Sequence, residues 1–319
     1  MKLYSKCKNN NNFSSFVGLK IANEAYKNSM LANKSSFIKT YSYNSFQKDL
    51  YGSRTNLMRN GRMANELLIP HLFWQCGLNA VEYFPWKMPK QENTQQPNNG
   101  LSSKNALEQD EKFLHLTGLR SIPEVIAYLN TFNSVSKDML KDIEQKLFVL
   151  SIVDFLTLQS DRNAGNMPIS VNKSLTIRFA KVFDNEYAFC CEHFGSPRFI
   201  ENSGIKKDEV NIDYVISEFN KDLKTGICTN FAPNASSTTL NATYKDVAES
   251  IANYATEHPH LLPVLYRTME NLDISKAANC LAAKGIEICP QYISYCNAIV
   301  NSGKMQILQE LENTTKNEK

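Results

Sequence analysis

The segment from residue 147 to 189 constrains the fold of this chain more than any other. Apolar residues recur at helical spacing from Met139 to Val153, with Ser136 as an N-cap, and Asp154 is the one carboxylate in the apolar stretch that ends at Leu158. This pattern predicts a buried helix that leads into a polar loop from Asp161 to Asn166.

A predicted hairpin follows the loop and brings a second carboxylate back to it. Residues 169–171 and 175–183 read as two strands, and they flank the turn-forming cluster at 172–174. The second strand ends at Asp184. The sequence therefore predicts that Asp184 lies beside the loop that contains Asp161 and Asn166.

The residue types in this loop suit phosphoryl transfer. A kinase needs a carboxylate that accepts the proton of the acceptor hydroxyl, and an amide oxygen and a second carboxylate that hold Mg²⁺ against the phosphates of ATP. Asp161 and Asn166 have the five-residue spacing of the first two groups, and Asp184 supplies the third. An isolated Asp and Asn at this spacing would be an ordinary solvated turn, but the helix before it and the hairpin after it favour an active site.

At these residues the chain resembles the HipA-like and phosphatidylinositol-kinase-like branch of the protein kinase superfamily. In that branch an apolar helix precedes a D-R-H-x-x-N loop, and a later strand ends in Asp. Here Asn163 replaces the usual His, and Asn185-Glu186 follows Asp184 where many kinases have Phe-Gly. Since Glu186 lacks the backbone freedom of glycine, we expect no switch that turns Asp184 in and out of the site.

The resemblance implies an α+β, bilobal protein-kinase-like fold. Its N-lobe would be small and β-rich with one helix, over residues 1–100, and its C-lobe larger and mostly helical, over residues 101–319. We expect the first 15 or so residues to be disordered. Residues 87–106 are polar and contain prolines and a glycine, so we expect a flexible connection there.

Two upstream residues fit the ATP-binding part of such a lobe. Lys39 lies in a predicted strand from Ser36 to Tyr41, where it would neutralise the ATP phosphates; the alternative is a lysine on the wet face of an edge strand. Glu66 lies in a predicted helix that ends at Gly77, and we expect it to form a salt bridge with Lys39. Pro70 should kink that helix.

The region that would cradle the phosphates contains no glycine-rich loop, because Gly18 is the only glycine between Phe16 and Lys39. HipA-like and lipid-kinase-like proteins often use serine or lysine donors instead. The nearest candidates for a turn that cradles the phosphates are residues 26–29 and residues 33–36, and within the second we expect Ser35 and Ser36 to bind the nucleotide. Beyond Asp184 the chain is irregular and polar up to residue 243, and then four helices are predicted, at 244–257, 260–272, 274–284 and 291–311, the last with a break near Gly303.

Composition excludes several classes of protein. Lys and Arg exceed Asp and Glu by only three, which gives no indication of a nucleic acid or an anionic membrane as partner. The eight cysteines include no C-x-x-C pair, and no apolar stretch is long enough to span a bilayer. We expect a cytoplasmic protein with reduced thiols, and we leave open its delivery into another cell and its oligomeric state.

The leading hypothesis is an ATP- and Mg²⁺-dependent kinase of HipA-like type that acts on a serine or threonine of a protein substrate. A lipid head group is an alternative acceptor, although the small net charge gives no support for a basic membrane-facing surface. The same residues could also serve an AMP transferase or a catalytically silent nucleotide-binding module.

Overall fold

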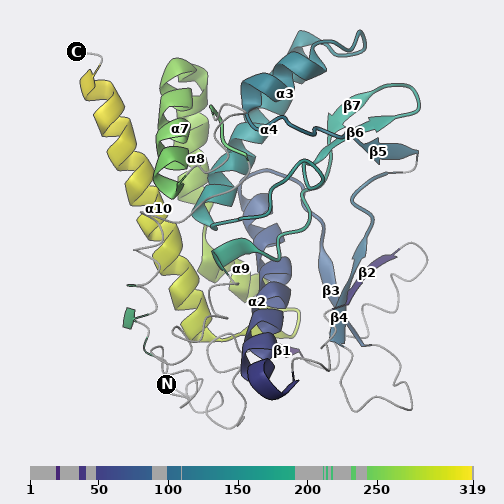
Figure 1. Ribbon diagram of the computed structural model, residues 1–319, viewed down its shortest axis with the longest axis vertical. Coiled ribbons are helices and arrows are strands. Elements are labelled where there is room, and N and C mark those ends of the chain that lie inside the picture. Colours follow the sequence, from purple (N-terminus) through teal and green to yellow (C-terminus); the bar gives the residue numbers. More distant parts are fainter. Residues whose placement is uncertain are drawn as a thin grey trace.

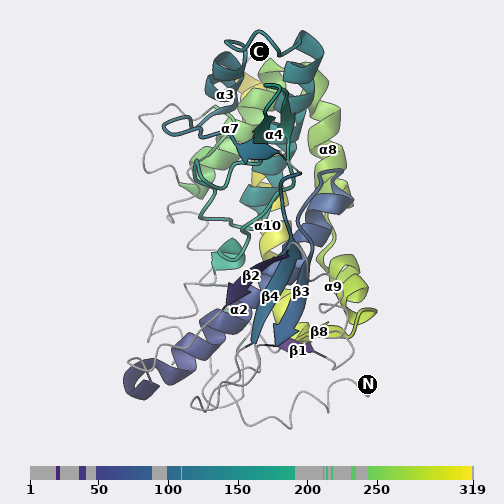
Figure 2. The same cartoon turned by 90° about the vertical axis from the view of Figure 1, so that its right-hand side faces the viewer.

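The computed structural model describes residues 19–21, 36–40, 48–87, 99–108, 110–190, 211, 213, 214, 217, 231–234 and 243–317. Within this part the molecule is elongated, with a small sheet and α2 (Lys48–Gln75) at one end and most of the other helices at the other end (Figure 1). The C-terminal helix α10 (Pro290–Asn317) extends from one of these ends to the other (Figures 1 and 2).

The first sheet is antiparallel and has the order β2-β4-β3. Its strands are β2 (Ser36–Thr40), β4 (Asn99–Lys104) and β3 (Tyr83–Lys87). The strand that contains Lys39 is thus confirmed, with Lys39 opposite Leu101 of β4. The expected flexible connection over residues 87–106 is wrong in its second half, because residues 99–104 form the central strand. Two neighbouring strands satisfy the backbone of this polar stretch, an effect of tertiary context that local composition does not reveal.

Helix α2 ends at Gln75, and Gly77 follows it as the sequence predicts, with φ of 81°, a conformation that glycine adopts without strain. It begins earlier than its apolar residues suggest and continues as helix through Pro70. Its buried residues from Met63 to Phe73 join the core. Loss of one backbone bond at Pro70 is therefore tolerated in a helix that packing stabilises.

The helix before the polar loop is confirmed as α4 (Lys137–Leu156), and Ser136 caps it by accepting a bond from Met139 N at 3.2 Å. Every residue from Leu147 to Leu156 is buried, so this half of α4 crosses the protein interior. The shorter α3 (Ile122–Leu129) packs against it.

The predicted hairpin is present as β6 (Ile169–Asn172) and β7 (Ile177–Phe179), and β5 (Glu111–Phe113) pairs with β6 on its other edge. The second strand is shorter than the expected 175–183. After Phe179 the chain leaves this sheet, and Val182 instead pairs with the segment before β3, through Val182 N to Asn79 O and Val81 N to Val182 O, both at 2.8 Å. This pairing carries Asp184 towards α2.

The C-terminal region contains α7 (Tyr244–Glu257), η6 (Pro259–Leu261), α8 (Leu262–Asn271), α9 (Ile274–Ala282), β8 (Ile286–Ile288) and α10. Helix α9 packs against α2, and β8 pairs with β1 (Leu19–Ile21), so part of this region lies beside the N-terminal sheet. The predicted boundary at residue 100 stays a prediction, and β4 crosses it.

The expected break near Gly303 is wrong, because α10 is continuous there. A Cβ atom at Gly303 would lie 2.9 Å from Leu156 Cδ2 and 3.4 Å from Phe155 Cε1. The glycine thus allows α10 to pack closely on the end of α4. The residue from which we predicted a helix break instead marks a close contact between two helices.

Candidate functional site

The loop from Asp161 to Asn166 is closed on itself by side-chain hydrogen bonds. Asn166 Nδ2 donates to the backbone oxygen of Asp161 at 2.8 Å and to its carboxylate Oδ2 at 3.3 Å. Both bonds use the amide nitrogen, which leaves the amide oxygen of Asn166 as the atom with which this side chain could bind a cation. The predicted juxtaposition of Asp161 and Asn166 is present.

Asn163 holds the other oxygen of the same carboxylate. Its Nδ2 donates to Asp161 Oδ1 at 2.7 Å, while its Oδ1 accepts from Gly165 N at 2.8 Å. An asparagine at this position can orient the carboxylate but cannot exchange a proton with it near neutral pH. The Asn163 side chain is therefore part of the loop's own hydrogen-bonded structure.

Gln159 links this loop to the chain around Asp184. Its side chain is buried, its Oε1 accepts from Asp161 N at 3.2 Å, and its Nε2 donates to Asp184 O at 3.2 Å. One side chain therefore fixes the backbone of both predicted catalytic carboxylates relative to each other.

Arg162 is the second link, and it is almost fully buried. It pairs with Asp154, and its Nη1 also donates to Asn166 O at 3.3 Å and to Phe183 O at 2.9 Å. Its Nη2 donates to Asn185 Oδ1 at 3.0 Å. Arg162 thus joins α4, the loop and the segment around Asp184.

Electrostatics keep this buried guanidinium charged. Burial opposes the charge, but the charge and hydrogen bonds of Asp154, together with other nearby carboxylates, outweigh burial and raise the pKa of Arg162 above its ordinary value. The carboxylates of Asp184 and Glu66 act in the same direction. Three acidic groups around one arginine make this a polar centre inside an apolar core.

Asp184 itself has a left-handed backbone, with φ of 58°. Aspartate tolerates this region better than most residues, yet it still costs energy and persists where neighbouring groups impose it. Besides Gln159, the hydroxyl of Tyr83 contributes by accepting from Asp184 N at 3.4 Å. The next amide, Asn185 N, donates to Glu66 Oε2 at 3.0 Å.

Three carboxylates converge at this point. One oxygen each of Glu66, Asp184 and Glu186 lies within 4.8 Å of the other two, with Glu66 buried and the others half-buried. Carboxylate oxygens, together with the Asn166 amide oxygen, are the hard donors that Mg²⁺ takes in proteins, so these residue types fit the implied ion. Sequence reasoning missed Glu186 as a member of this group.

The expected pairing of Glu66 with Lys39 falls partly outside the described residues. Glu66 lies on α2 as predicted and contacts the chain after Asp184. For Lys39 and Ser36 the structure describes only their backbone positions in β2. Ser35 lies outside the described residues. The structure therefore brings together Asp161, Asn166, Asp184 and Glu66.

The residues that connect the site were not predicted from the sequence. These are Asp154, Gln159, Arg162 and Asn163. One signal was available, because Asp154 is a lone carboxylate in a helix segment predicted to be buried, and an ionised carboxylate there needs a buried cationic partner. Arg162 follows the predicted base and was the natural candidate.

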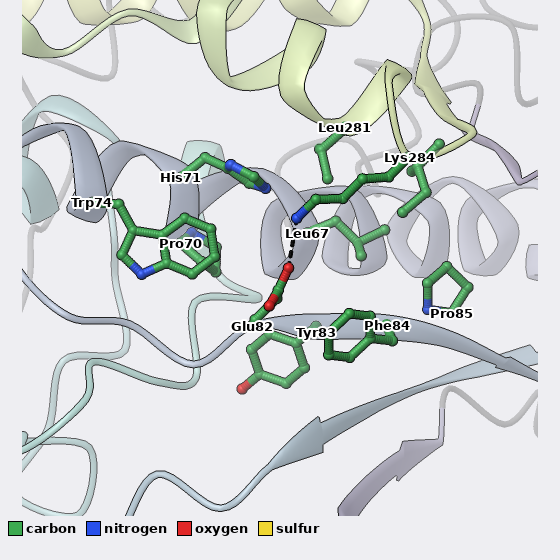
Figure 3. A pocket seen from close by; sticks show the side chains of 11 residues that line it. Leu67, Pro70, His71, Trp74, Glu82, Tyr83, Phe84, Pro85, Leu281 and Lys284 are labelled. Carbon is green, nitrogen blue, oxygen red and sulfur yellow. Dashed lines mark hydrogen bonds and ion pairs between the residues drawn. The ribbon is translucent and has the colours of Figure 1, made fainter. Parts of the chain in front are cut away.

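A separate hollow lies between α2, β3 and the end of α9 (Figure 3). It has room for little more than water, about 40 Å³, and its lining includes Trp74, His71 and Phe84. Lys284 and Glu82 form an ion pair across it at 2.5 Å. The hollow includes none of the residues predicted for catalysis.

No protein-family model matches the chain, and no curated protein matches it. Among solved structures, the chain is similar to the crystal structure of a Helicobacter pylori proinflammatory kinase, CtkA, with a TM-score of 0.58 and 12% sequence identity. The match covers 90% of this chain and 93% of that chain. The chain therefore has a mixed α+β, protein-kinase-like fold. Among the described helices, none is both long and apolar enough to cross a membrane.

Proposed function

We propose that the protein is an ATP- and Mg²⁺-dependent phosphotransferase of HipA-like type that phosphorylates a serine or threonine of a protein substrate. The observation that supports this most is the placement of Asp161, Asn166 and Asp184 around one buried arginine, Arg162. A kinase-like fold that carries these three side chains near one another has the groups that phosphoryl transfer requires.

Asp161 is the group that orients the acceptor hydroxyl and takes its proton. Two amides, from Asn163 and Asn166, hold its carboxylate. As the acceptor oxygen forms its bond to the γ-phosphorus, the bond from that phosphorus to the β-phosphate oxygen breaks, ADP leaves, and the hydroxyl proton passes to the carboxylate.

Asp184 and Asn166 are the residues that would hold Mg²⁺, and the carboxylate of Glu186 lies near that of Asp184. Bound there, the ion would neutralise charge on the phosphates. Lys39, Ser35 and Ser36 are proposed as nucleotide-binding residues, and Glu66 is proposed to hold Lys39. The division into an N-lobe over residues 1–100 and a C-lobe over 101–319 is part of the same proposal.

The test uses pure protein incubated with Mg²⁺ and either γ-labelled or α-labelled ATP, with a generic protein acceptor and with phosphoinositide vesicles in parallel. Label from the γ position on protein supports the proposal. Label on lipid would identify a lipid kinase, and label from the α position would identify an AMP transferase. ATP binding without any transfer from wild type would favour a nucleotide-binding module.

A matched pair of variants guards against a contaminating kinase. Asp161→Asn should lose transfer, whereas Asp142→Asn, on the exposed face of α4, should retain it. Equal labelling by both variants would reject the assignment of the activity to this site.

A further inference from the structure

The six residues that begin at Asp184 are bracketed by two strained positions. Asp184 has φ of 58° and Phe189 has φ of 54°, and neither is glycine. Left-handed backbone is unfavourable for such residues and persists where surrounding contacts determine it. We call residues 184–189 the post-Asp184 segment. Its strained backbone implies that contacts with the rest of the protein hold it in this conformation.

Asn65 of α2 holds the middle of the post-Asp184 segment. It is fully buried, and its Nδ2 donates to Glu186 O at 3.1 Å and to Ala188 O at 2.6 Å. Its Oδ1 accepts from the hydroxyl of Tyr292 at 2.5 Å. The tyrosine thereby fixes which way the amide of Asn65 points, since the amide must present its nitrogen to the two carbonyls.

Phe189 is held from two sides. Its N donates to Thr157 O at 2.5 Å, at the end of α4, and its O accepts from the hydroxyl of Tyr295 at 2.9 Å. Both Phe189 and Tyr295 are fully buried. The end of the segment is therefore tied to α4 and to α10 at once.

The two tyrosines act as a pair on α10. They are three residues apart, which puts them on one face of the helix, and their rings stack with centroids 5.6 Å apart. Figure 1 shows α10 passing α2 at one end of the molecule and α7 at the other. The C-terminal helix, far from Asp184 in sequence, thus reaches the chain next to it.

We propose that Tyr292 and Tyr295 are positioning residues through which α10 holds the post-Asp184 segment, and so directs the Asp184 carboxylate into the candidate metal site. The inference rests on the proposed function of Asp184 as a metal ligand. A tyrosine that only filled the core would keep its contribution when the hydroxyl is removed, because the ring remains. The hydroxyls are what the proposal needs.

The first test is amide hydrogen exchange of the intact protein, read by mass spectrometry on peptides that cover residues 184–190. The amides of Asp184, Asn185, Ala188 and Phe189 are hydrogen-bonded donors in this range. Tyr292→Phe and Tyr295→Phe should each speed exchange in these peptides by about fivefold, the factor that one lost neutral hydrogen bond implies.

Tyr254→Phe is the matched control. The Tyr254 hydroxyl donates to Glu144 at 2.6 Å, so the control also removes a hydroxyl from a buried ring, but between α7 and α4. It should leave exchange of residues 184–190 unchanged. If all three variants change these peptides equally, or none does, the inference is wrong.

The second test is the Mg²⁺ concentration required for half-maximal ATP binding. The two α10 variants should raise it severalfold while Tyr254→Phe leaves it unchanged. The exchange result does not depend on catalysis. A wild-type protein that transfers no phosphate would therefore contradict the proposed function but leave the exchange test valid. Faster exchange with an unchanged Mg²⁺ requirement would overturn the link to Asp184.

Discussion

The guanidinium of Arg162 donates to both carboxylate oxygens of Asp154, from Nε at 2.8 Å and from Nη2 at 2.9 Å, with both side chains shielded from solvent. The pair spans from the buried half of α4 to the loop that contains Asp161. Because Arg162 also bonds to backbone oxygens on either side of the site, the pair couples the stability of the fold to the geometry of the site.

Asp154→Asn should strongly destabilise the protein. The amide keeps the shape but leaves the buried guanidinium without its counter-charge, a change that typically costs about 3–5 kcal/mol. Urea unfolding followed by circular dichroism measures the loss. The control is Asp142→Asn, which removes an exposed pair with Lys146 and should cost less than about 0.5 kcal/mol. Equal losses would contradict the role given to Asp154.

How far the sequence predicts this site depends on the range of each interaction. Asp161 and Asn166 were predictable because their relation is local, five residues within one loop. The approach of Asp184 was predictable through the hairpin, although its β7 strand is short. Asn65 and Tyr292 could not be paired from sequence, since the contact joins residues far apart and depends on how α10 packs.

The strands show the same limit. The strand of Lys39 has the β-branched and aromatic residues that predict it, whereas β4 is polar and was expected to be a linker. The strands on its two sides, β2 and β3, supply hydrogen-bond partners for the backbone of β4. The composition of β4 does not predict these partners. Similarly, Gly303 was expected to break a helix, because a sequence does not distinguish a flexible glycine from one that permits close packing.

Gly303→Ala should destabilise the protein by about 1–3 kcal/mol, since the new methyl group would press on the buried side chain of Leu156, and either that side chain or α10 would have to shift. Thermal unfolding of the variant measures this. Asn301→Ala, an exposed position two residues earlier on the same helix, should be neutral or slightly stabilising. A stabilised Gly303→Ala variant would show that α10 does not pack this closely on α4.

His71 should make stability depend on pH. Burial, and then the charge of Lys284, lower the pKa of His71 from 6.5 to about 4, while Glu82 acts in the opposite direction. The unfolded chain therefore binds a proton on this ring between pH 6.5 and 4 and the folded protein does not, so stability falls as the pH is lowered through that range. Allowing for screening by solvent around the half-exposed Lys284 and Glu82, we expect a loss of about 1–2 kcal/mol.

The measurement is urea unfolding at several pH values for wild type, His71→Gln and His115→Gln. The first substitution removes the titrating ring and should flatten the pH dependence between 6.5 and 4. The second removes an exposed histidine and should leave the wild-type slope unchanged. A His71→Gln protein that retains the full slope would refute the assignment.

Asp184→Asn should weaken binding of Mg²⁺-ATP or abolish transfer, because the variant replaces a charged ligand with a neutral one beside Glu66 and Glu186. Calorimetric titration with ATP, with and without Mg²⁺, measures the effect. In wild type the ion should strengthen ATP binding, and in the variant this difference should shrink about tenfold or more. An unchanged dependence on Mg²⁺ would remove Asp184 from the metal site.

Asp161→Asn, in contrast to Asp184→Asn, should impair phosphate transfer without weakening the binding of Mg²⁺-ATP. Asparagine preserves the shape of the side chain and the backbone bond that Asn166 makes to residue 161, but it removes the base. Affinity for Mg²⁺-ATP should persist while single-turnover transfer falls on the order of 10²-fold or more.

The alternative for Asp161 is a structural one, in which the carboxylate serves mainly to accept hydrogen bonds from Asn163 and Asn166. In that case Asn163→Ala, which removes the shorter of those two bonds, should impair ATP binding and folding as much as Asp161→Asn does. If Asp161 is the base, Asn163→Ala should slow transfer only moderately, because Asn166 still holds the carboxylate. Near-normal transfer by Asp161→Asn would end the catalytic assignment, since an asparagine cannot take the proton from the acceptor hydroxyl.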